Sequence, residues 1–419
     1  MGIIPSARRL QLRRITRHRI SRILLLVFAL VSFFDVLQVH HGIRSNEERE
    51  PTKQGSGNRR SRQQERIYIT GLHYNDGELL RNHWMTSLLE LCDELGPSNV
   101  FVSLHESGSW DDTKEMLRWL DQVLEERGVA RHIEVSDESH QDVIDQGFAE
   151  GEWVETSARE KAVRRIPHLA RLRNKTLQDL IELNKNGVKF DKVLFLNDVV
   201  FTTEDVMTLM ETNGGEYAAA CSLDFDAPPI YYDTFALRDS AGRPDQMLWW
   251  PYFRPGPSRD ALMKNIDAVP VTSCWNGIVV MPAEPFVSST QLRFRAIPNS
   301  LAAHHLEGSE CCLIHADNPL SKSLGVYLNP RVRVGYNKKA YDVTHPKGSW
   351  ISTWAILRGL WVNRLKTWTT GLFWDDLVQN RVISKVKKWE KEAMGNSEPG
   401  VFCLINEMHV LVWNGWAHI

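Results

Sequence analysis

The chain has 419 residues, of which 42% are hydrophobic and 24% are charged. These proportions are ordinary for a globular protein and exclude disordered, collagen-like and polytopic membrane proteins. The formal net charge of −2 is unevenly distributed, because the first 34 residues carry seven arginines and no acid, which leaves 43 basic and 52 acidic side chains in the remainder. A globular part that is net acidic argues against a general nucleic-acid-binding protein.

The N-terminal segment predicts a membrane anchor. Residues 23–34 read ILLLVFALVSFF, and we expect a span over residues 20–39, short but adequate for a hydrocarbon core of about 30 Å. Because the arginines precede the span, residues 1–19 should form a cytosolic tail and everything after the span should be lumenal. The alternative is a cleaved signal peptide, but no small-x-small cleavage site follows. Residues 40–65 contain the polar stretch PTKQGSGNRRSRQQ and predict a flexible stem.

The rest of the chain alternates between short β-rich runs and stretches with helical apolar spacing. This alternation predicts a mostly parallel, Rossmann-like α/β sheet with flanking helices in a domain of residues 66–345. Such sheets bind ligands beyond the carboxyl ends of their strands. Neither GxGxxG nor GxxxxGK[ST] occurs at a strand–helix turn, which weakens the dinucleotide and P-loop interpretations. We expect strands at residues 67–70, 100–104, 132–135, 192–196, 218–222 and 277–281, and helices at residues 78–95, 111–127, 167–186 and 204–210.

Two further segments differ in composition from this pattern. Residues 224–271 are irregular and rich in Pro, Tyr and Trp, and we interpret them as an insertion that covers the substrate. Residues 346–419 form a Trp-rich C-terminal extension that we expect to pack on the catalytic domain. Trp354, Trp361 and Trp368 are seven residues apart, which places them on one helix face, either packed on the core or in contact with a membrane surface.

Six cysteines permit disulfides in an oxidising lumen, but their pairing cannot be deduced from the sequence. Cys221 lies in a predicted buried strand, where a cysteine is most simply a core side chain. No CxxC or Cys/His zinc spacing occurs, so structural zinc is not expected.

The first candidate site residue is Asp198, in the stretch FLNDVVF that follows the buried run KVLFL. An acid at the end of such a strand faces the ligand cleft, and its hard oxygens suit Mn²⁺ or Mg²⁺. A divalent ion neutralises the diphosphate of a nucleotide sugar. The alternative is a cap for the next helix, but Thr203 can serve as that cap. We therefore predict a metal-binding and catalytic role for Asp198.

The helix predicted at residues 167–186 contains the second candidate. Arg173 falls within its apolar stripe. A buried arginine requires an anionic partner, and both a nucleotide diphosphate and a structural carboxylate satisfy that requirement. Asn174 borders the same face and begins a glycosylation sequon, Asn174-Lys175-Thr176. If this helix packs at the site, the sequon should be unused.

Asp224 and Asp226 follow another predicted strand. Acids at positions i and i+2 of an extended chain point the same way, so this pair suits a metal, sugar hydroxyls or no ligand at all. A denser cluster, HHLEGSECCLIHAD at residues 304–317, contains three more candidates. A glutamate there suits a general base or a ligand of sugar hydroxyls, and His315 can complete a metal site begun by Asp198.

At these residues the sequence resembles the fungal capsule-associated α-1,3-mannosyltransferases, a family of GT-A-type, type II membrane glycosyltransferases. The resemblance covers roughly residues 67–341, and the ending VLVWNGWAHI is similar too. The matching stretches are FDKVLFLNDVVF (190–201), YAAACSLDF (217–225), YDTFALRDSAG (232–242), SCWNGIVV (273–280) and HLEGSECCLIHADNP (305–319).

The resemblance implies a Golgi membrane enzyme that transfers mannose from GDP-mannose to a mannose-containing glycan, in α-1,3 linkage with retention, during capsule, cell-wall or glycolipid synthesis. It implies Mn²⁺ or Mg²⁺ as cofactor, with Asp198 as the DxD-type metal acid and His315 as the C-terminal metal ligand. Glu307 or Glu310 would face the acceptor, and Asp224 is a further catalytic candidate. The candidate donor-binding residues are Arg173, Asn174, Asn197, Asp226, Trp275 and Asn276.

One departure from the family pattern concerns the metal. The usual motif has two acids, whereas Leu196-Asn197-Asp198 has one, so metal affinity is lower or a ligand comes from Asp224, Asp226 or His315. Two other functions stay open: transfer from another donor such as a UDP-sugar, and a non-catalytic polysaccharide assembly or export factor on the same fold. The expected partners are a nucleotide-sugar donor, a glycan acceptor and the membrane, without nucleic acid.

Overall fold

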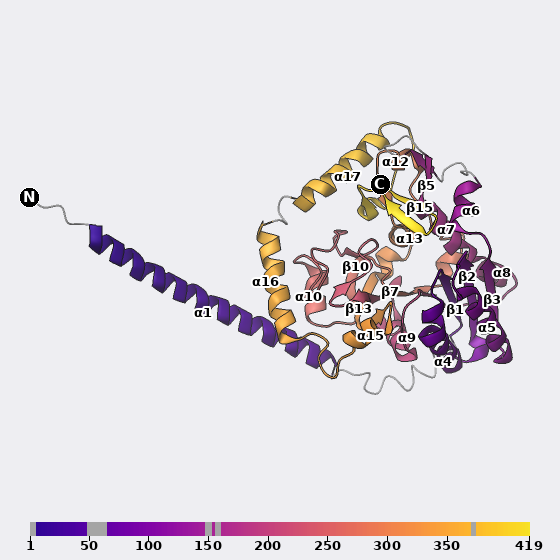
Figure 1. The fold of residues 1–419 in the computed structure, drawn as a ribbon, viewed down its shortest axis with the longest axis horizontal. Helices are drawn as coiled ribbons and strands as arrows, with labels where there is room; N and C mark the ends of the chain where they lie inside the picture. Colours follow the sequence, from indigo (N-terminus) through magenta and orange to yellow (C-terminus); the bar gives the residue numbers. More distant parts are fainter. Residues whose placement is uncertain (1–5, 48–64, 147–152, 156–160, 370–373) are drawn as a thin grey trace, which may run out of the picture.

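A computed structural model describes residues 6–47, 65–146, 153–155, 161–369 and 374–419 (Figure 1). Helix α1 (Ser6–Glu47) projects from the rest of the molecule. Within the described residues it is the one helix that is long and apolar enough to cross a membrane, over Arg19–Ser45. The helix continues through residues 40–47, where a flexible stem was expected; the remainder of the expected stem, at 48–64, lies outside the described residues.

A central sheet organises the domain that follows. Its strand order is β3-β2-β1-β6-β11-β7-β13-β10-β9, with β8 beside β7. The pairs β3–β2, β2–β1, β1–β6 and β7–β13 are parallel, whereas β11 is antiparallel to both of its neighbours. The mostly parallel α/β fold predicted from the sequence is confirmed. The strands are β1 (Ile67–His73), β2 (Val100–Ser107), β3 (Ala130–Ser136), β6 (Lys192–Leu196), β7 (Ala219–Ala227), β8 (Ile230–Tyr231), β9 (Arg238–Asp239), β10 (Val269–Ser273), β11 (Ile278–Pro282) and β13 (Val326–Gly335).

Helices cover both faces of the sheet and create two hydrophobic cores. Strand β6 shows why, because all five of its residues are buried and successive side chains point to opposite faces. Phe195 belongs to one core, and Leu194 and Leu196 to the other. The helices include α3 (Gly77–Leu79), α4 (Met85–Leu95), α5 (Thr113–Glu126), α6 (His140–Asp145), α7 (Arg165–Lys175), α8 (Gln178–Lys185), α9 (Thr203–Met210), α10 (Pro257–Met263), α11 (Glu284–Val287), α12 (Asn299–Ala302), α13 (Glu310–Asp317), α14 (Ser321–Leu324) and α15 (Lys338–Thr344).

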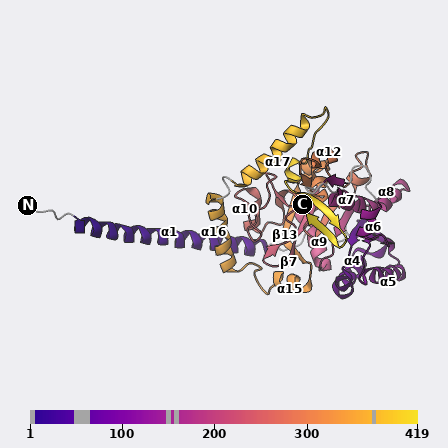
Figure 2. The same cartoon turned by 45° about the horizontal axis from the view of Figure 1, so that its top comes forward.

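The C-terminal segment returns to the domain after α16 (Thr353–Thr369) and α17 (Trp374–Glu390). Strand β14 (Leu404–Ile405) pairs with β12 (Glu307–Gly308), and β15 (His409–Val412) forms a hairpin with β16 (Gly415–His418). In the turned view this hairpin lies in front of the sheet, with the C-terminus at the centre of the domain (Figure 2). A third small pair joins β4 (Trp153–Glu155) and β5 (Lys161–Val163).

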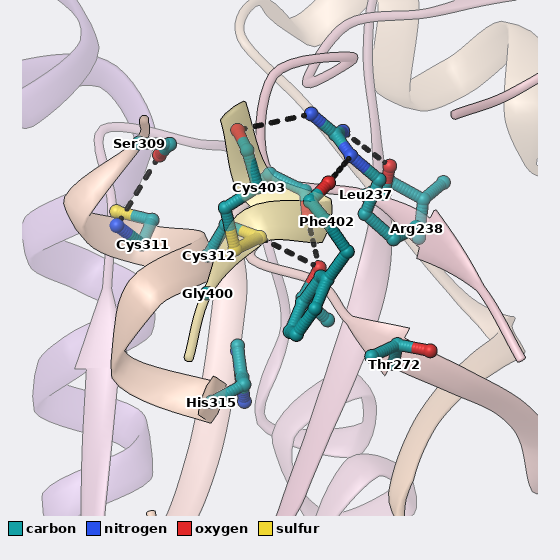
Figure 3. Close-up of a disulfide and its surroundings, with 12 residues drawn as sticks. Leu237, Arg238, Thr272, Ser309, Cys311, Cys312, His315, Gly400, Phe402 and Cys403 are labelled. Carbon is teal, nitrogen blue, oxygen red and sulfur yellow. Dashed lines mark hydrogen bonds between the residues drawn. A yellow bond between two sulfur atoms is a disulfide. The ribbon is translucent and has the colours of Figure 1, made fainter. Parts of the chain in front are cut away.

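Two disulfides tie distant segments together. Cys221 pairs with Cys274, so the residue expected to be a simple core side chain is cross-linked. Cys312 on α13 pairs with Cys403 next to β14. Figure 3 shows this second disulfide beside Arg238, whose guanidinium donates to the carbonyl oxygens of Phe402 and Cys403. The C-terminal segment is therefore attached covalently to α13 and by hydrogen bonds to Arg238 of β9.

Candidate active site

A cleft opens at the carboxyl ends of β1 and β6, where the sequence predicted ligand binding. Its first part has a volume of about 710 Å³ and is lined by His73, Asn197 and Asp198 from the strand ends. Its second part has a volume of about 470 Å³ and is lined by Glu310, among others. The two parts share Arg173, Asn197 and several further residues, so they form one continuous cleft.

Asp198 faces the first part of the cleft, as predicted. Its carboxylate is half-buried, and burial together with the negative charge of Asp76 raises its pKa to about 7, although His73 and Arg173 act in the opposite direction. A carboxylate with a raised pKa holds its negative charge at a cost. A cation bound at this position would remove that cost.

His73 ends β1 next to Asp198. Its Nδ1 lies 2.6 Å from Oδ2 of Asp76, and both side chains are buried. Burial lowers the pKa of His73, but the charges of Asp76, Asp198 and Glu106 outweigh this effect and raise it. Its Nε2 is buried and has no hydrogen-bond partner among the described residues. This ring nitrogen is therefore available to a ligand in the cleft.

Helix α7 forms a cationic wall of the cleft. Arg165, Leu169, Leu172 and Arg173 all line the first part, which follows from their spacing on one helix face. Arg173 lies 3.0 Å from Glu310 through its Nε, and its guanidinium lies 4.7 Å from the centre of the Trp275 ring. From the sequence, the anionic partner of Arg173 was either a nucleotide diphosphate or a structural carboxylate. In the structure the partner is the carboxylate of Glu310, and Arg173 also lines the cleft.

Asn197, Trp275 and Asn276 fix the cleft floor. The backbone N–H of Asn197 donates to the carbonyl of Gly277, and its side-chain oxygen accepts from the indole of Trp275. Gly277 has φ +90°, and a Cβ there would lie 2.5 Å from the side chain of Val334, so only glycine fits this turn. Trp275 lines the second part of the cleft, whereas Asn276 is fully buried beneath it.

The acid pair after β7 divides between two environments. Asp224 is fully buried, accepts hydrogen bonds from Asn276 and Tyr336, and has a pKa raised to about 7 by burial and by the charge of Asp233. Asp226 is exposed and lines the first part of the cleft, where Asn337 donates to it. Asp226 is therefore placed to contact a ligand, whereas Asp224 supports the residues around it.

The dense acidic cluster separates in the same way. Glu310, at the start of α13, is 2% exposed and lines the second part of the cleft. Glu307 lies outside the cleft lining, in a bidentate ion pair with Arg164 whose closest contact is 2.7 Å, and both side chains are fully buried. The sequence predicted that either Glu307 or Glu310 would face the acceptor. Only Glu310 remains a candidate, because Arg164 binds both carboxylate oxygens of Glu307.

The expected pairing of Asp198 with His315 is corrected by the structure. The Nε2 of His315 lies 2.7 Å from the carbonyl oxygen of Cys274, and burial lowers the pKa of the imidazole to about 4. Figure 3 shows His315 on α13, near the disulfide region. Its neighbouring sulfurs, Cys221 and Cys274, are joined to each other and so are not metal ligands. His315 is a buried structural histidine.

Asn174 is also placed differently from the expectation. Its side-chain amide donates to the carbonyl of Phe294 and accepts from the backbone N–H of the same residue. The helix expected at residues 167–186 is broken at Thr176 and Leu177 into α7 and α8. Asn174 thus connects α7 to the loop containing Phe294 and does not line the cleft.

The C-terminal hairpin covers the cleft. Leu411, Asn414 and Trp416 line the first part, and Trp416 also lines the second part. The guanidinium of Arg165 lies 4.2 Å from the centre of the Trp416 ring. At the rim, potential ligand atoms of Glu407, His409 and His418 lie within 4.8 Å of one another. The hairpin therefore forms a wall of the cleft. The sequence analysis assigned these residues to an extension packed on the domain and did not predict that they line the cleft.

Sequence reasoning missed several residues of the site. His73 and Asp76 were missed because the first strand was expected to end at residue 70, whereas β1 continues to His73, opposite Glu106 of β2. The strand-end rule that identified Asp198 would have identified them. Arg165 shares a helix face with Arg173 and was recognisable from that spacing. Asp233, which lines the second part of the cleft, had no comparable signal.

The sheet is mostly parallel and has an acid-bearing cleft at its strand ends, which is where open α/β sheets bind their ligands. The family model described as Cryptococcal mannosyltransferase 1 matches residues 66–317, more than half of the chain. The chain belongs to this mannosyltransferase family, as the resemblance in the sequence predicted. No curated protein matches the chain.

Several solved structures are similar to the chain at low identity. The mannosyltransferase PcManGT from Pyrobaculum calidifontis, in complex with GDP-Man and Mn²⁺, is 10% identical with a TM-score of 0.36, and the match covers 90% of this chain and 96% of that one. TarS residues 1–349 from S. aureus are 8% identical with a TM-score of 0.36, covering 78% and 82%. The glucosyl-3-phosphoglycerate synthase of M. tuberculosis is 12% identical with a TM-score of 0.30, covering 74% and 82%.

Proposed function

We propose that the protein is a Golgi mannosyltransferase that transfers mannose from GDP-mannose to a mannose-containing glycan, in α-1,3 linkage with retention. The cleft carries this proposal, because it is lined both by Asp198 and by Arg165 and Arg173 of α7, and positive groups of this kind suit the recognition of a sugar diphosphate. Membership of the mannosyltransferase family supports mannose as the transferred sugar.

The first part of the cleft is the proposed donor site. Arg165 and Arg173 would bind the diphosphate, since guanidinium groups match phosphate oxygens. Asn197, Trp275 and Asp226 would contact the remainder of the donor from the floor and rim. In the transfer, the bond between the anomeric carbon and the diphosphate oxygen breaks, and the two arginines would stabilise the charge that develops on the leaving diphosphate.

A divalent cation such as Mn²⁺ or Mg²⁺ fits the same part of the cleft. Asp198 lines this part with a pKa raised by burial and by Asp76, so a bound cation would remove the cost of its negative charge. Such ions are commonly held by one or two carboxylates together with substrate phosphates, so the single acid of the Leu196-Asn197-Asp198 motif is sufficient. When bound, the ion would supply charge neutralisation of the diphosphate.

The second part of the cleft is the proposed acceptor site. Glu310 and Asp233 line it, and their negative charges interact, since Glu310 helps burial to raise the pKa of Asp233. Carboxylates of this kind accept hydrogen bonds from sugar hydroxyls, so Glu310 would position the attacking hydroxyl. The oxygen of that hydroxyl would form the new bond to the anomeric carbon, and its proton would pass to the leaving diphosphate oxygen on the same face of the sugar, which gives retention. The C-terminal hairpin would exclude water, which favours transfer to the acceptor over hydrolysis of the donor.

Helix α1 is the proposed single-pass anchor. Its apolar stretch follows an arginine-rich tail, an arrangement that favours a cytosolic N-terminus and a lumenal catalytic domain. Two disulfides in the domain are compatible with an oxidising lumen.

The test is a donor screen with the full-length protein in detergent micelles. We expect transfer of labelled mannose from GDP-mannose to mannoside acceptors, loss of transfer with EDTA, and recovery with Mn²⁺. Asp198→Ala should abolish transfer, whereas the matched control Asp137→Ala, at a 95% exposed carboxylate, should retain it. Transfer from a UDP-sugar alone would refute the proposed donor. No transfer from any nucleotide sugar, with the fold intact, would instead favour the non-catalytic alternative.

A further inference from the structure

Helix α16 presents a row of large apolar side chains away from the domain. Trp354, Trp361, Leu365 and Trp368 are spaced by seven, four and three residues, which places them within one narrow face of a helix. Trp354 is 72% exposed, Leu365 is 51% exposed and Trp368 is 62% exposed. We call these four residues the α16 stripe. Isolated exposed apolar residues need no explanation, but a row of three tryptophans and a leucine does.

The opposite face of α16 already packs on the domain. Ile356, Gly359, Leu360 and Asn363 are buried, and a Cβ at Gly359 would lie 2.4 Å from the carbonyl oxygen of Trp250. The helix is therefore held closely to the core by one face, which leaves the stripe on the other face. Packing on the core thus explains the buried face but not the stripe.

The stripe meets the anchor helix. The rings of Phe28 and Trp361 lie 4.6 Å apart, and the indole N–H of Trp361 donates to the hydroxyl of Ser32. Arg364 forms a bidentate ion pair with Asp35, with contacts of 2.6 and 2.8 Å. These contacts fix α16 at the level of the apolar run of α1, and the two helices cross rather than run side by side (Figures 1 and 2).

This crossing gives α16 the orientation of an interfacial helix. If α1 crosses the bilayer with its N-terminus in the cytosol, a helix that crosses it at residues 28–35 lies beside the lumenal half of the apolar run, at the level of the lumenal leaflet. The apolar run at residues 23–34 is about 18 Å long at 1.5 Å per residue, shorter than a hydrocarbon core of about 30 Å. Beyond it, Val39 and Ile43 are buried in the domain. The apolar run of α1 is therefore too short to fill the hydrocarbon core on its lumenal side. The α16 stripe offers additional apolar surface on that side.

We propose that the α16 stripe inserts into the lumenal leaflet of the bilayer and seats the catalytic domain on the membrane. Tryptophan and leucine are side chains that interfacial helices bury at the headgroup boundary. The inference rests on the proposed membrane anchor. The occupant is the lipid bilayer, because the stripe is continuous with the exposed apolar surface of α1 through the Phe28–Trp361 contact.

The test uses the full-length protein in phosphatidylcholine vesicles, with a nitroxide label on one introduced cysteine at a time. Leu365→Cys reports on the stripe, Leu25→Cys on the anchor, and Trp119→Cys, at a 49% exposed side chain on α5, is the solvent control. The free cysteines Cys92 and Cys311 are buried, and the labelled parent protein measures any background from them. Collision of each label with oxygen, which concentrates in lipid, is compared with collision with a water-soluble nickel chelate.

We expect oxygen collisions to predominate at positions 25 and 365 and nickel collisions to predominate at position 119. A label at 365 that behaves like the one at 119, while position 25 is in lipid, would overturn the inference but leave the anchor intact. A label at 365 shielded from both reagents would also overturn it, in favour of contact with a second copy or another protein. Nickel collisions at position 25 would show that the anchor proposal itself had failed.

Discussion

Replacing Asp198 by asparagine should stabilise the folded protein at neutral pH while it abolishes activity. Burial and the charge of Asp76 raise the pKa of Asp198 from an ordinary value of 3.8 to about 7. Each unit of this difference corresponds to about 1.4 kcal/mol. The negative charge on Asp198 therefore costs the folded state up to about 4 kcal/mol once both folded and unfolded chains have lost the proton.

The raised pKa of Asp198 also predicts how the stability difference between the two proteins changes with pH. Well below pH 3.8, the ordinary pKa of an aspartate, Asp198 is protonated in both states, so the aspartate and asparagine proteins should be similarly stable. Between pH 4 and pH 7 the unfolded chain loses the proton while the folded protein keeps it, so the stability of the aspartate protein falls relative to that of the variant. Above pH 7 the difference should stay constant. Asparagine cannot make all the favourable interactions of the aspartate carboxylate. We therefore expect the difference in the free energy of unfolding between variant and parent to reach about 1–3 kcal/mol, below the limit of about 4 kcal/mol.

The assay is thermal unfolding of both full-length proteins in detergent, followed by intrinsic fluorescence from pH 4 to pH 8 without divalent cations. Adding Mn²⁺ at pH 8 should stabilise only the aspartate protein, because a ligand stabilises the state that binds it. A variant that is less stable than the parent at pH 8, or a difference that does not change with pH, would refute the reasoning about the charge on Asp198.

Three further outcomes are expected. Glu307→Gln should destabilise the protein by about 3–5 kcal/mol, because it leaves Arg164 as an unpaired buried charge, while the folded fraction keeps its kcat. Cys403→Ser should lower stability by up to about 4–5 kcal/mol, since the Cys312–Cys403 disulfide closes a separation of 91 residues, and should raise hydrolysis of the donor relative to transfer. Asn174→Gln should leave the electrophoretic mobility unchanged when the protein is expressed in the secretory pathway. The side-chain amide of Asn174 is hydrogen-bonded to the backbone of Phe294, which should keep the sequon unused.

Each of these outcomes has a clear opposite. A stable Glu307→Gln protein without activity would restore Glu307 as a catalytic candidate; Glu310→Gln, which we expect to lose transfer, is the comparison. An unchanged ratio of hydrolysis to transfer in Cys403→Ser would mean that the hairpin does not depend on the disulfide to cover the cleft. Loss of a glycan on replacing Asn174 would show that the sequon is used and that its side-chain nitrogen does not make the described contact with Phe294.

The fold and the centre of the site were predictable from local patterns. Strand β6 is a run of buried apolar residues that ends in an acid, and the strand-end rule places such an acid at the ligand edge. Arg173 was recognisable because an arginine in an apolar helical stripe requires an anion. Both inferences depend only on neighbours a few residues away.

The misplaced residues depend on partners far along the chain. Glu307 and Glu310 are three residues apart and equally acidic, yet Arg164 takes one and Arg173 keeps the other at the cleft. His315 was expected to be a metal ligand because it lies in a segment rich in acids and histidines. Its imidazole is instead within hydrogen-bond distance of the carbonyl oxygen of Cys274, a residue of the Cys221–Cys274 disulfide. Long-range pairing of this kind leaves no periodic signal in the sequence.

The distribution of buried charge distinguishes the cleft from the rest of the domain. Away from it, the buried Arg164 holds Glu307 with two hydrogen bonds, and the half-buried Arg295 is held by two carboxylates. In the cleft, Asp198 faces the repulsion of Asp76, and among the described residues Arg165 has no carboxylate partner. Burying unmatched charge is costly, so a fold shaped by stability alone would pair these groups as it pairs the others. A cleft lined by both Asp198 and Arg165 is instead suited to a ligand that carries both charges, a cation bound to a sugar diphosphate.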